Sequence, residues 1–138
     1  MSVLLNPYIS FNGNAREAME FYQSVFGGDL QVMAFGDIPG MAQSGDQEAL
    51  VMHSMLTGDN GVFLMGSDTP EGMEYNPFNG TISLSGDDED ILRGWWEKLA
   101  DGGTVGMPLE KAPWGDTFGQ LTDRFGVGWM VNVAGQPQ

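Results

Sequence analysis

The sequence contains a single histidine, His53, in the largely apolar stretch "ALVMHSML" (49–56), and no cysteine. An imidazole has an ordinary pKa near neutrality, so His53 is the best single candidate for a catalytic general acid or base. A histidine in a strand can equally be a structural residue with one ring nitrogen held by the backbone. Side chains alternate between the two faces of a strand, and the sequence leaves open which face His53 occupies. The absence of cysteine excludes disulfides and thiolate chemistry.

A metal site built around His53 would need at least two further ligands from elsewhere in the chain. The available carboxylates, Glu48, Glu110, Asp116 and Asp123, fall in predicted loops or turns. The sequence also lacks a glycine-rich strand-to-helix loop followed by an acidic residue, which a nucleotide-type cofactor needs. We therefore expect neither a catalytic metal nor another cofactor.

Several methionine and aromatic side chains are candidates for contact with a ligand. Met65 and Met130 should lie on equivalent strands, and methionine adapts its shape to flat or irregular apolar molecules. In "KAPWGDTFG" (111–119), Trp114 can stack on a ligand while Asp116 adds charge. Alternatively, the methionines could simply fill the hydrophobic core, and Trp114 could form a hydrophobic plug under a turn without contacting a ligand. The candidate ligand-binding residues are Tyr8, His53, Phe63, Met65, Trp114, Asp116, Phe118, Met130 and Asn132.

Two stretches of the chain repeat, which indicates how these residues are positioned. The segment "ISFNG" (9–13) matches "ISLSG" (82–86) at an offset of 82 − 9 = 73. Further on, "LTGDNGVFLM" (56–65) matches "LTDRFGVGWM" (121–130) at an offset of 121 − 56 = 65. Two matches in the same order favour an internal duplication.

Each copy reads as a strand, a helix and three further strands. The predicted fold class is therefore α+β, with two tandem βαβββ modules whose curved mixed β-sheets form a cleft. We expect one domain, 1–138, made of modules at 7–66 and 79–133 joined by a linker at 67–79. Each sheet would carry a helix on one face, and the two bare faces would form a shared pocket.

The two predicted helices have recognisable ends and an apolar side. In the first helix Asn14 is the expected N-cap, with Glu17 completing a capping box, and Gly27-Gly28 end it. In the second helix Asp87 or Asp88 is the expected cap. The first helix should bury Ala15, Ala18, Met19, Tyr22, Val25 and Phe26, and both aromatic pairs, Phe21-Tyr22 and Trp95-Trp96, should lie in the core.

Three connecting segments have distinct signatures. "GDN" (58–60) and "DRFG" (123–126) are predicted to turn the hairpin that leads into the last strand of each copy. The segment 36–48 is long and contains glycines, which is typical of a lid or a partner contact, although it could equally be slack.

The chain carries 19 acidic residues against 5 basic ones, a net charge of −14. The bases are scattered, whereas binding to phosphate backbones needs clustered lysine and arginine, so we expect no nucleic-acid partner. No apolar run is long enough to span a membrane and no signal peptide is visible, so we expect a cytoplasmic protein. The acidic charge could attract a cationic ligand, but solubility or salt adaptation is the favoured explanation.

Taken together, "NPYISFNGNAREAMEFYQSVFGG", "LMGSD" and "PLEKAPWGDTFGQLTDRFGVGWMVN" resemble the PhnB-like branch of the vicinal-oxygen-chelate superfamily. That superfamily includes glyoxalase I, bleomycin-resistance proteins and extradiol dioxygenases, and the resemblance covers nearly the whole chain. Members of this branch are sometimes labelled as demethylubiquinone methyltransferase-like, but the missing nucleotide-type loop argues against methyl transfer. The resemblance implies a small-molecule ligand, apolar or aromatic, and a homodimer.

Enzymes of the superfamily hold a divalent metal with one His or Glu from the first and fourth strand of each module. The resemblance maps these positions to Pro7 or Tyr8, to Met65, to Gly80 or Thr81, and to Met130. None of these residues is a usual ligand for such an ion.

The function expected from the sequence is therefore a PhnB-like small-molecule-binding protein without the usual metal ligands. One alternative is a metal-independent or divergent enzyme of isomerase, lyase or dioxygenase type that uses His53 or a carboxylate. The other is a resistance protein that sequesters a drug.

Overall fold

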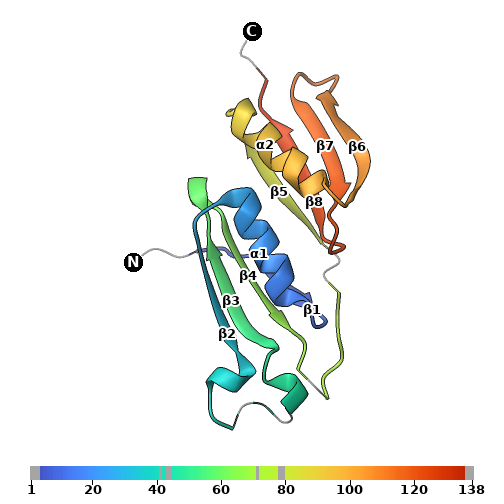
Figure 1. Ribbon diagram of the computed structural model, residues 1–138. Helices are drawn as coiled ribbons and strands as arrows, with labels where there is room; N and C mark the ends of the chain where they lie inside the picture. The colour runs from blue at the N-terminus through green and yellow to red at the C-terminus, as the bar shows by residue number, and fades with distance from the viewer. Residues whose placement is uncertain (1–3, 41, 43–44, 71, 78–79, 136–138) are drawn as a thin grey trace. The chain divides into compact units, whose positions relative to one another are not determined.

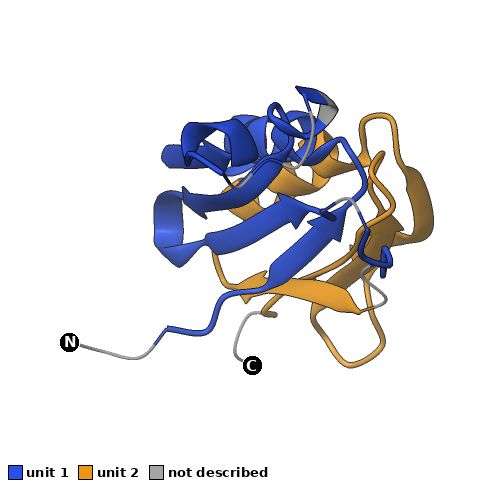
Figure 2. Cartoon of the chain, turned by 90° about the horizontal axis from the view of Figure 1, so that it is seen from below, with its two compact units in different colours: residues 1–78 blue, residues 79–138 orange. Residues whose placement is uncertain are grey.

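The computed structural model describes residues 4–40, 42, 45–70, 72–77 and 80–135 of the chain (Figure 1). The chain forms two compact units, residues 1–78 and residues 79–138, which are coloured separately in Figure 2. No helix among the described residues is long and apolar enough to cross a bilayer.

The first unit contains one helix and one four-stranded sheet. Its elements are β1 (Tyr8–Phe11), α1 (Ala15–Phe26), β2 (Asp29–Ala34), β3 (Val51–Thr57) and β4 (Phe63–Asp68), with short 3₁₀ helices η1 (Phe35–Asp37), η2 (Gly45–Gln47) and η3 (Asp59–Gly61). The strand order is β1-β4-β3-β2. The pair β1–β4 is parallel and the other two pairs are antiparallel.

The second unit repeats this arrangement. Its elements are β5 (Thr81–Gly86), α2 (Glu89–Ala100), β6 (Thr104–Lys111), β7 (Thr117–Thr122) and β8 (Gly128–Val133). The strand order is β5-β8-β7-β6, again with a parallel first pair. The identical order confirms the prediction of an α+β fold made of two tandem βαβββ modules.

The register of the first strand differs from the simple repeat in the sequence. Tyr8 pairs with Met65, and Ser83 pairs with Met130, the residue equivalent to Met65 at the offset of 65. The structural offset between β1 and β5 is therefore 83 − 8 = 75, two residues more than the match of "ISFNG" with "ISLSG". A shift of two residues leaves every side chain on its original face of the strand.

In each unit the helix covers one face of the sheet, and the opposite face is referred to below as the open face. Helix α1 packs against β2, β3 and β4. The side of this helix that was predicted to be apolar is fully buried, as expected. The sheet residues facing it are also buried, including Ile9, Phe11, Leu56 and Leu64. Because side chains alternate between the two faces of a strand, the residues between these buried ones lie on the open face.

The N-terminus of α1 is capped differently from the prediction. Asn14 makes no side-chain capping hydrogen bond, so the predicted capping box with Glu17 is wrong. The carboxylate of Asp68, at the end of β4, instead accepts hydrogen bonds from the backbone N–H groups of Gly13 and Ala15, both at 2.9 Å. Its second oxygen accepts from the N–H of Val51 at 2.9 Å. A carboxylate at this place also lies favourably in the dipole of the helix.

The other predicted ends and turns agree with the structure. Asp88 caps α2 by accepting a hydrogen bond from the N–H of Ile91 at 3.2 Å. Gly27 and Gly28 follow α1 with positive φ angles of 73° and 87°. Residues 59–61 form η3 between β3 and β4. At the second hairpin, the N–H of Asp123 donates to the carbonyl of Val127 at 2.9 Å.

The paired aromatic residues of the helices are less buried than predicted. Tyr22 is fully buried, but Phe21, Trp95 and Trp96 are only half-buried. A Cβ at Gly119 would lie 2.7 Å from the ring of Trp96, so this indole covers a bare stretch of β7 on the helix side of the sheet. The prediction that both pairs lie wholly in the core is therefore wrong for three of the four rings.

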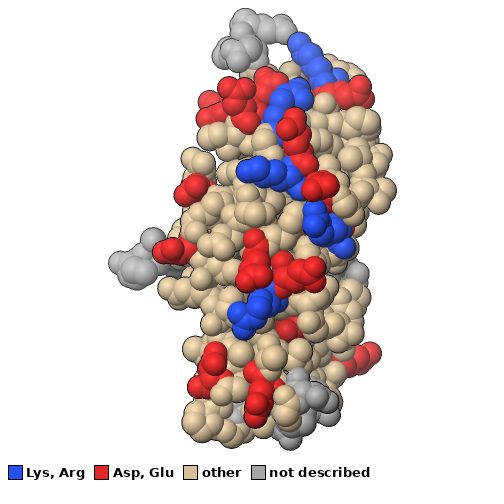
Figure 3. Space-filling model, in the orientation of Figure 1, with Lys and Arg blue, Asp and Glu red and all other residues tan. Residues whose placement is uncertain are grey.

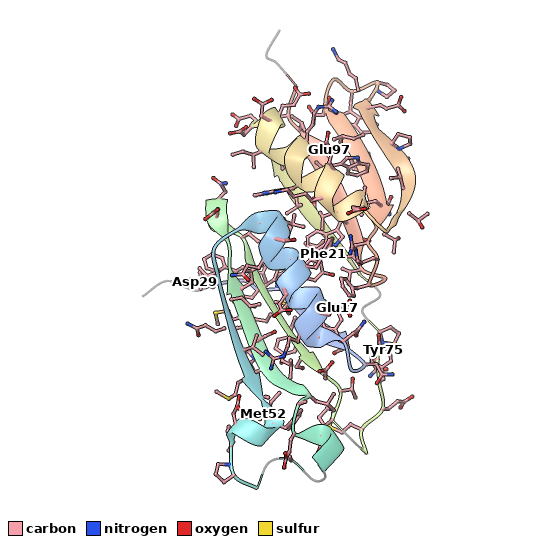
Figure 4. The ribbon with its side chains drawn as sticks, in the orientation of Figure 1. Glu17, Phe21, Asp29, Met52, Tyr75 and Glu97 are labelled. Carbon is pink, nitrogen blue, oxygen red and sulfur yellow. The ribbon has the colours of Figure 1, made fainter. Side chains whose placement is uncertain are left out.

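The acidic residues of the two helices lie on the solvent-exposed sides of these helices, as a role in solubility requires. Figure 3 shows acidic side chains on the helix-bearing face of each unit, with basic ones among them. Figure 4 labels Glu17 on α1 and Glu97 on α2 as examples. The five acidic residues of the two helices are exposed: Glu17, Glu20, Glu89, Asp90 and Glu97.

Replacing Asp68 by asparagine should lower the free energy of unfolding by about 2 kcal/mol, because the amide nitrogen cannot accept a hydrogen bond and the charge is lost. Urea denaturation followed by circular dichroism measures the change. The control is Asp29→Asn, at an exposed carboxylate on β2, which should change stability by less than about 0.5 kcal/mol. Equal losses in the two variants would contradict the capping role of Asp68.

Candidate functional site

The open face of the first sheet brings together four of the residues predicted to bind a ligand. Tyr8 on β1 pairs with Met65 on β4, which pairs in turn with Met55 on β3. His53 lies two residues before Met55 and pairs with Met33 on β2. Phe63 lies two residues before Met65, so strand alternation puts it on the same face. The structure therefore answers the question left open by the sequence: His53 occupies the open face.

Met33 and Met55 were not predicted, although they share this surface. A β-bulge explains why His53 and its neighbours were hard to place: Met33 pairs with His53, but the next residue, Ala34, pairs with Val51. Met52 is thus the extra residue, and simple alternation fails at that point. Once His53 is known to face outward, alternation alone identifies Met55.

His53 and Tyr8 form a pair on this face. The phenol oxygen of Tyr8 lies 3.5 Å from Nδ1 of His53, at the long limit for a hydrogen bond. The two rings are stacked, with centroids 6.0 Å apart and planes inclined by 27°. Tyr8 is 45% exposed, so a molecule on this surface would touch it directly. A phenol beside an imidazole can fix a polar group by hydrogen bonding or move a proton.

The open face of the second sheet carries the corresponding residues of the second unit. Met130 pairs with Ser83 and Gln120, and Asn132 pairs with Ser85 and Phe118. Met130, Asn132 and Phe118 are half-buried, whereas their strand neighbours Trp129, Val131 and Val133 are buried on the helix side. The three predicted residues on these strands therefore share the open face.

The loop between β6 and β7 forms a hollow beside this sheet. The hollow has a volume of about 270 Å³ and is lined by Trp114 and Phe118, together with Met107. The rings of Trp114 and Phe118 have centroids 6.1 Å apart and are tilted by 60°. Trp114 is 66% exposed, so it is not the buried plug considered as an alternative. The side chains of Glu110 and Lys111 also line the hollow, so it carries both signs of charge.

Asp116 is held by hydrogen bonds within the second unit. One carboxylate oxygen accepts from Nδ2 of Asn132 at 3.0 Å, and the other accepts from the N–H of Gly135 at 2.8 Å. These bonds, first that from Asn132 and then that from Gly135, hold the pKa of the Asp116 carboxyl below its ordinary value of 3.8. Both oxygens are thus used to fasten the β6–β7 loop to β8, which weakens the case for Asp116 as the partner of a cationic ligand.

The positions at which related enzymes hold a metal are occupied in this chain by residues that are not usual ligands for a divalent metal. In the first unit they correspond to Tyr8 and Met65, which pair directly. In the second unit the partner of Met130 is Ser83 rather than Gly80 or Thr81, because of the two-residue shift in register. Across the described residues, no group of three or more His, Cys, Asp or Glu side chains is placed to hold a metal ion.

Two helix-covered sheets of identical strand order, each with a methionine-bearing open face, define a paired βαβββ protein. A model of the glyoxalase/bleomycin resistance protein/dioxygenase superfamily matches residues 4–131. The chain therefore belongs to this superfamily.

Individual relatives narrow the assignment within the superfamily. Protein YjdN of Escherichia coli strain K12 is 32% identical over 143 residues, covering 96% of each chain. The crystal structure of protein PA1353 from Pseudomonas aeruginosa is 40% identical, with a TM-score of 0.82 over 96% of this chain and 98% of that one. The PhnB protein from Bacillus cereus is 28% identical, with a TM-score of 0.69 over 96% of this chain and all (100%) of that one. The chain is thus a member of the PhnB-like branch.

The lowered pKa of Asp116 predicts how the stability of Asp116→Asn depends on pH. Because the folded-state pKa lies below the unfolded value, the carboxylate stabilises the fold fully above pH 3.8, and this stabilisation is lost as the pH falls through the folded-state pKa. The wild type should therefore be more stable than Asp116→Asn at pH 7, and the difference should vanish in strong acid. Thermal unfolding between pH 2 and pH 7 measures it. A constant difference for Asp116→Asn across this pH range would contradict the assignment.

Proposed function

We propose that this chain is a small-molecule-binding protein whose ligand, an apolar or aromatic molecule, lies on the open face of the first sheet and is held without a metal. The observation that carries the proposal is the contact between Tyr8 and His53, beside Met33, Met55 and Met65. Ligand sites are mostly apolar surfaces with a few polar groups that fix orientation, and this face has that composition. Its methionines can adapt to a flat molecule.

The hollow beside Trp114 and Phe118 supports the same chemistry in the second unit. Its tilted aromatic rings favour a planar group, which can stack on an exposed indole. The charges of Glu110 and Lys111 oppose one another there, so the hollow has no strong preference for a cation. We assign this hollow to ligand binding as a second surface.

The ligand is proposed to be neutral rather than cationic. Asp116 already accepts hydrogen bonds with both oxygens, and the open face of the first sheet presents methionine, tyrosine and histidine. Among the described residues, the carboxylates near these surfaces are Asp29, which by strand alternation lies at the edge of the open face, and Glu110, whose charge is balanced by Lys111. A drug-sequestering role based on acidic attraction would therefore have to rest chiefly on Asp29.

The binding surface can be tested with three probes of similar shape: neutral 1-naphthol, cationic 1-naphthylmethylamine and anionic 1-naphthoate. Naphthol should bind at least as well as the amine at pH 7, and raising the salt concentration from 0.05 to 0.5 M (about a threefold decrease in Debye length) should change its affinity little. Tyr8→Ala should weaken naphthol binding about fivefold or more, because the stacking surface and the phenol are both lost. Titration followed by ¹H–¹⁵N NMR measures both effects.

The matched control is Tyr75→Ala, which removes a ring of similar exposure (39% against 45% for Tyr8) away from the open face. It should leave unchanged the naphthol-induced shifts of the open-face amides of Tyr8, Met55 and Met65, and the Kd obtained from them. Salt-sensitive binding of the amine alone would favour cation sequestration, and naphthol binding that is insensitive to Tyr8→Ala would overturn the proposed surface.

A catalytic function is the second candidate, and the Tyr8–His53 contact favours it specifically. His53 could remove a proton from a carbon next to a carbonyl and return one from solvent, while Tyr8 hydrogen-bonds to the imidazole. With phenylacetone in D₂O, the wild type should then speed exchange of the α-protons for deuterium, as followed by proton NMR. His53→Asn should abolish the acceleration while keeping naphthol binding; exchange at the buffer rate with wild-type protein would eliminate this candidate.

We also propose that the protein is a homodimer, in line with the resemblance to its family. Sedimentation velocity of the tag-free chain between 1 and 100 μM (an affinity range of about 6 to 8 kcal/mol) measures the assembly. A monomer across this range would contradict it.

A further inference from the structure

A second hollow lies at one end of the first sheet and contains none of the predicted ligand-binding residues. Its volume is about 330 Å³, at the lower end of the range typical of small-molecule pockets. Asn12 directly follows β1, Thr69 directly follows β4, and Leu50 directly precedes β3; all three line it. Tyr8 begins β1 and Phe11 ends it, so the hollow lies about 10 Å along the strand from the Tyr8–His53 pair.

The floor of this hollow is fixed by the carboxylate of Asp68. Asp68 binds the N–H groups of Gly13 and Val51, which are the chain neighbours of Asn12 and Leu50. Asp68 is itself the neighbour of Thr69, and it is only 3% exposed. The three chain segments that converge on the hollow are therefore held together by one buried group, as a preformed site requires.

The polar groups lining the hollow have a defined hydrogen-bonding character. The hydroxyl of Thr69 donates to the carbonyl of Phe11 at 3.0 Å, so it offers a ligand only its lone pairs. Asn12 supplies an exposed side-chain amide, whereas the amide of Gln47 is only 2% exposed and already has an interaction within the fold. A ligand matching this set would donate an N–H to Thr69 and present a carbonyl oxygen to an amide N–H₂.

The outer part of the hollow is apolar and flat-sided. Met73 and Tyr75 line it from the segment after β4 and are 67% and 39% exposed, so both side chains can be reached by a ligand. Figure 4 labels Tyr75 on this segment, beside the beginning of α1. A planar ring between these side chains would bury apolar surface that is otherwise left in water.

Every described residue that lines the hollow is uncharged. Among these described residues a charged ligand would find no ionic partner to offset its loss of hydration, so a neutral molecule is favoured. We propose that this hollow is a second small-molecule site that takes an uncharged aromatic amide. The amide N–H donates to Oγ1 of Thr69, the carbonyl accepts from the side-chain amide of Asn12, and the ring lies against Met73 and Tyr75. This inference does not depend on the ligand proposed for the open face.

Benzamide tests the proposal in NMR titrations of the full chain with labelled methionine methyl groups and labelled backbone amides. It should shift the Met73 methyl and the backbone amides of Asn12 and Thr69 in a saturable way. Tyr75→Ala should raise the Kd for benzamide at least fivefold, since the ring that covers the ligand is lost. N,N-dimethylbenzamide, which has no N–H to donate, and benzoate, which carries a charge, should each bind at least fivefold more weakly than benzamide.

Tyr8→Ala is the matched control and should leave the Kd for benzamide unchanged, whereas the same variant weakens naphthol on the open face. Asn12→Leu should weaken benzamide as well, because it removes the amide N–H₂ that binds the carbonyl. The site is overturned if benzamide gives no saturable shifts, if its shifts follow Tyr8→Ala, or if dimethylbenzamide or benzoate binds as tightly. Loss of naphthol binding with benzamide binding retained would contradict the proposed function alone.

Discussion

A buried carboxylate at the end of β4 holds three separate parts of the first unit together. Asp68 accepts hydrogen bonds from Gly13 and Ala15 at the start of α1 and from Val51 at the start of β3. Its charge is dispersed over three backbone dipoles and the helix N-terminus, which is how a carboxylate can remain buried among apolar groups. The angle at which α1 leaves β1 follows from these bonds. With the helix held over one face of the sheet, the other face, with Tyr8 and His53, is left open.

The second unit reaches the same fold by other interactions. The position equivalent to Asp68 is Val133 (133 − 68 = 65), and α2 is capped locally by Asp88. The buried carboxylate of the second unit is Asp123, in the turn before β8, where it binds the N–H groups of Phe125 and Val127 and the indole of Trp129. Among the residues whose burial is described, each copy therefore has one buried aspartate, and the two lie at opposite ends of the corresponding hairpins. The strand order survives this exchange because it depends on the alternation of buried residues in the strands rather than on any one polar contact.

The parts of the fold that depend on local patterns were predictable, and those that depend on distant contacts were not. The buried stripe of α1 follows from a spacing of 3.6 residues within one segment, and all six predicted residues are buried. The capping of the same helix was mispredicted because Asn14 is the best local candidate for the N-cap. The residue that accepts the hydrogen bonds, Asp68, lies 68 − 14 = 54 residues further along the chain. At the site, Met65 and Met130 could be placed by the repeat. The face of His53 could not be, because the bulge at Met52 interrupts the alternation.

The distribution of charge bears on what the surfaces can bind. Asp68 and Asp123 are buried and accept hydrogen bonds from the fold. Asp88 caps α2, and Asp116 holds the β6–β7 loop against β8, so these two acids also have structural roles. The acids of the helix surfaces are exposed and lie beside bases such as Arg93, which forms an ion pair with Glu89 at 2.6 Å. An exposed pair of this kind adds little stability, but dispersed negative charge keeps molecules apart in solution. The open face of the first sheet and the hollow beside Asp68 instead present methionine, aromatic and amide groups. The net charge of −14 is therefore spread over the helix surfaces, loops and strand ends, whereas the candidate binding surfaces carry few acids and favour neutral molecules.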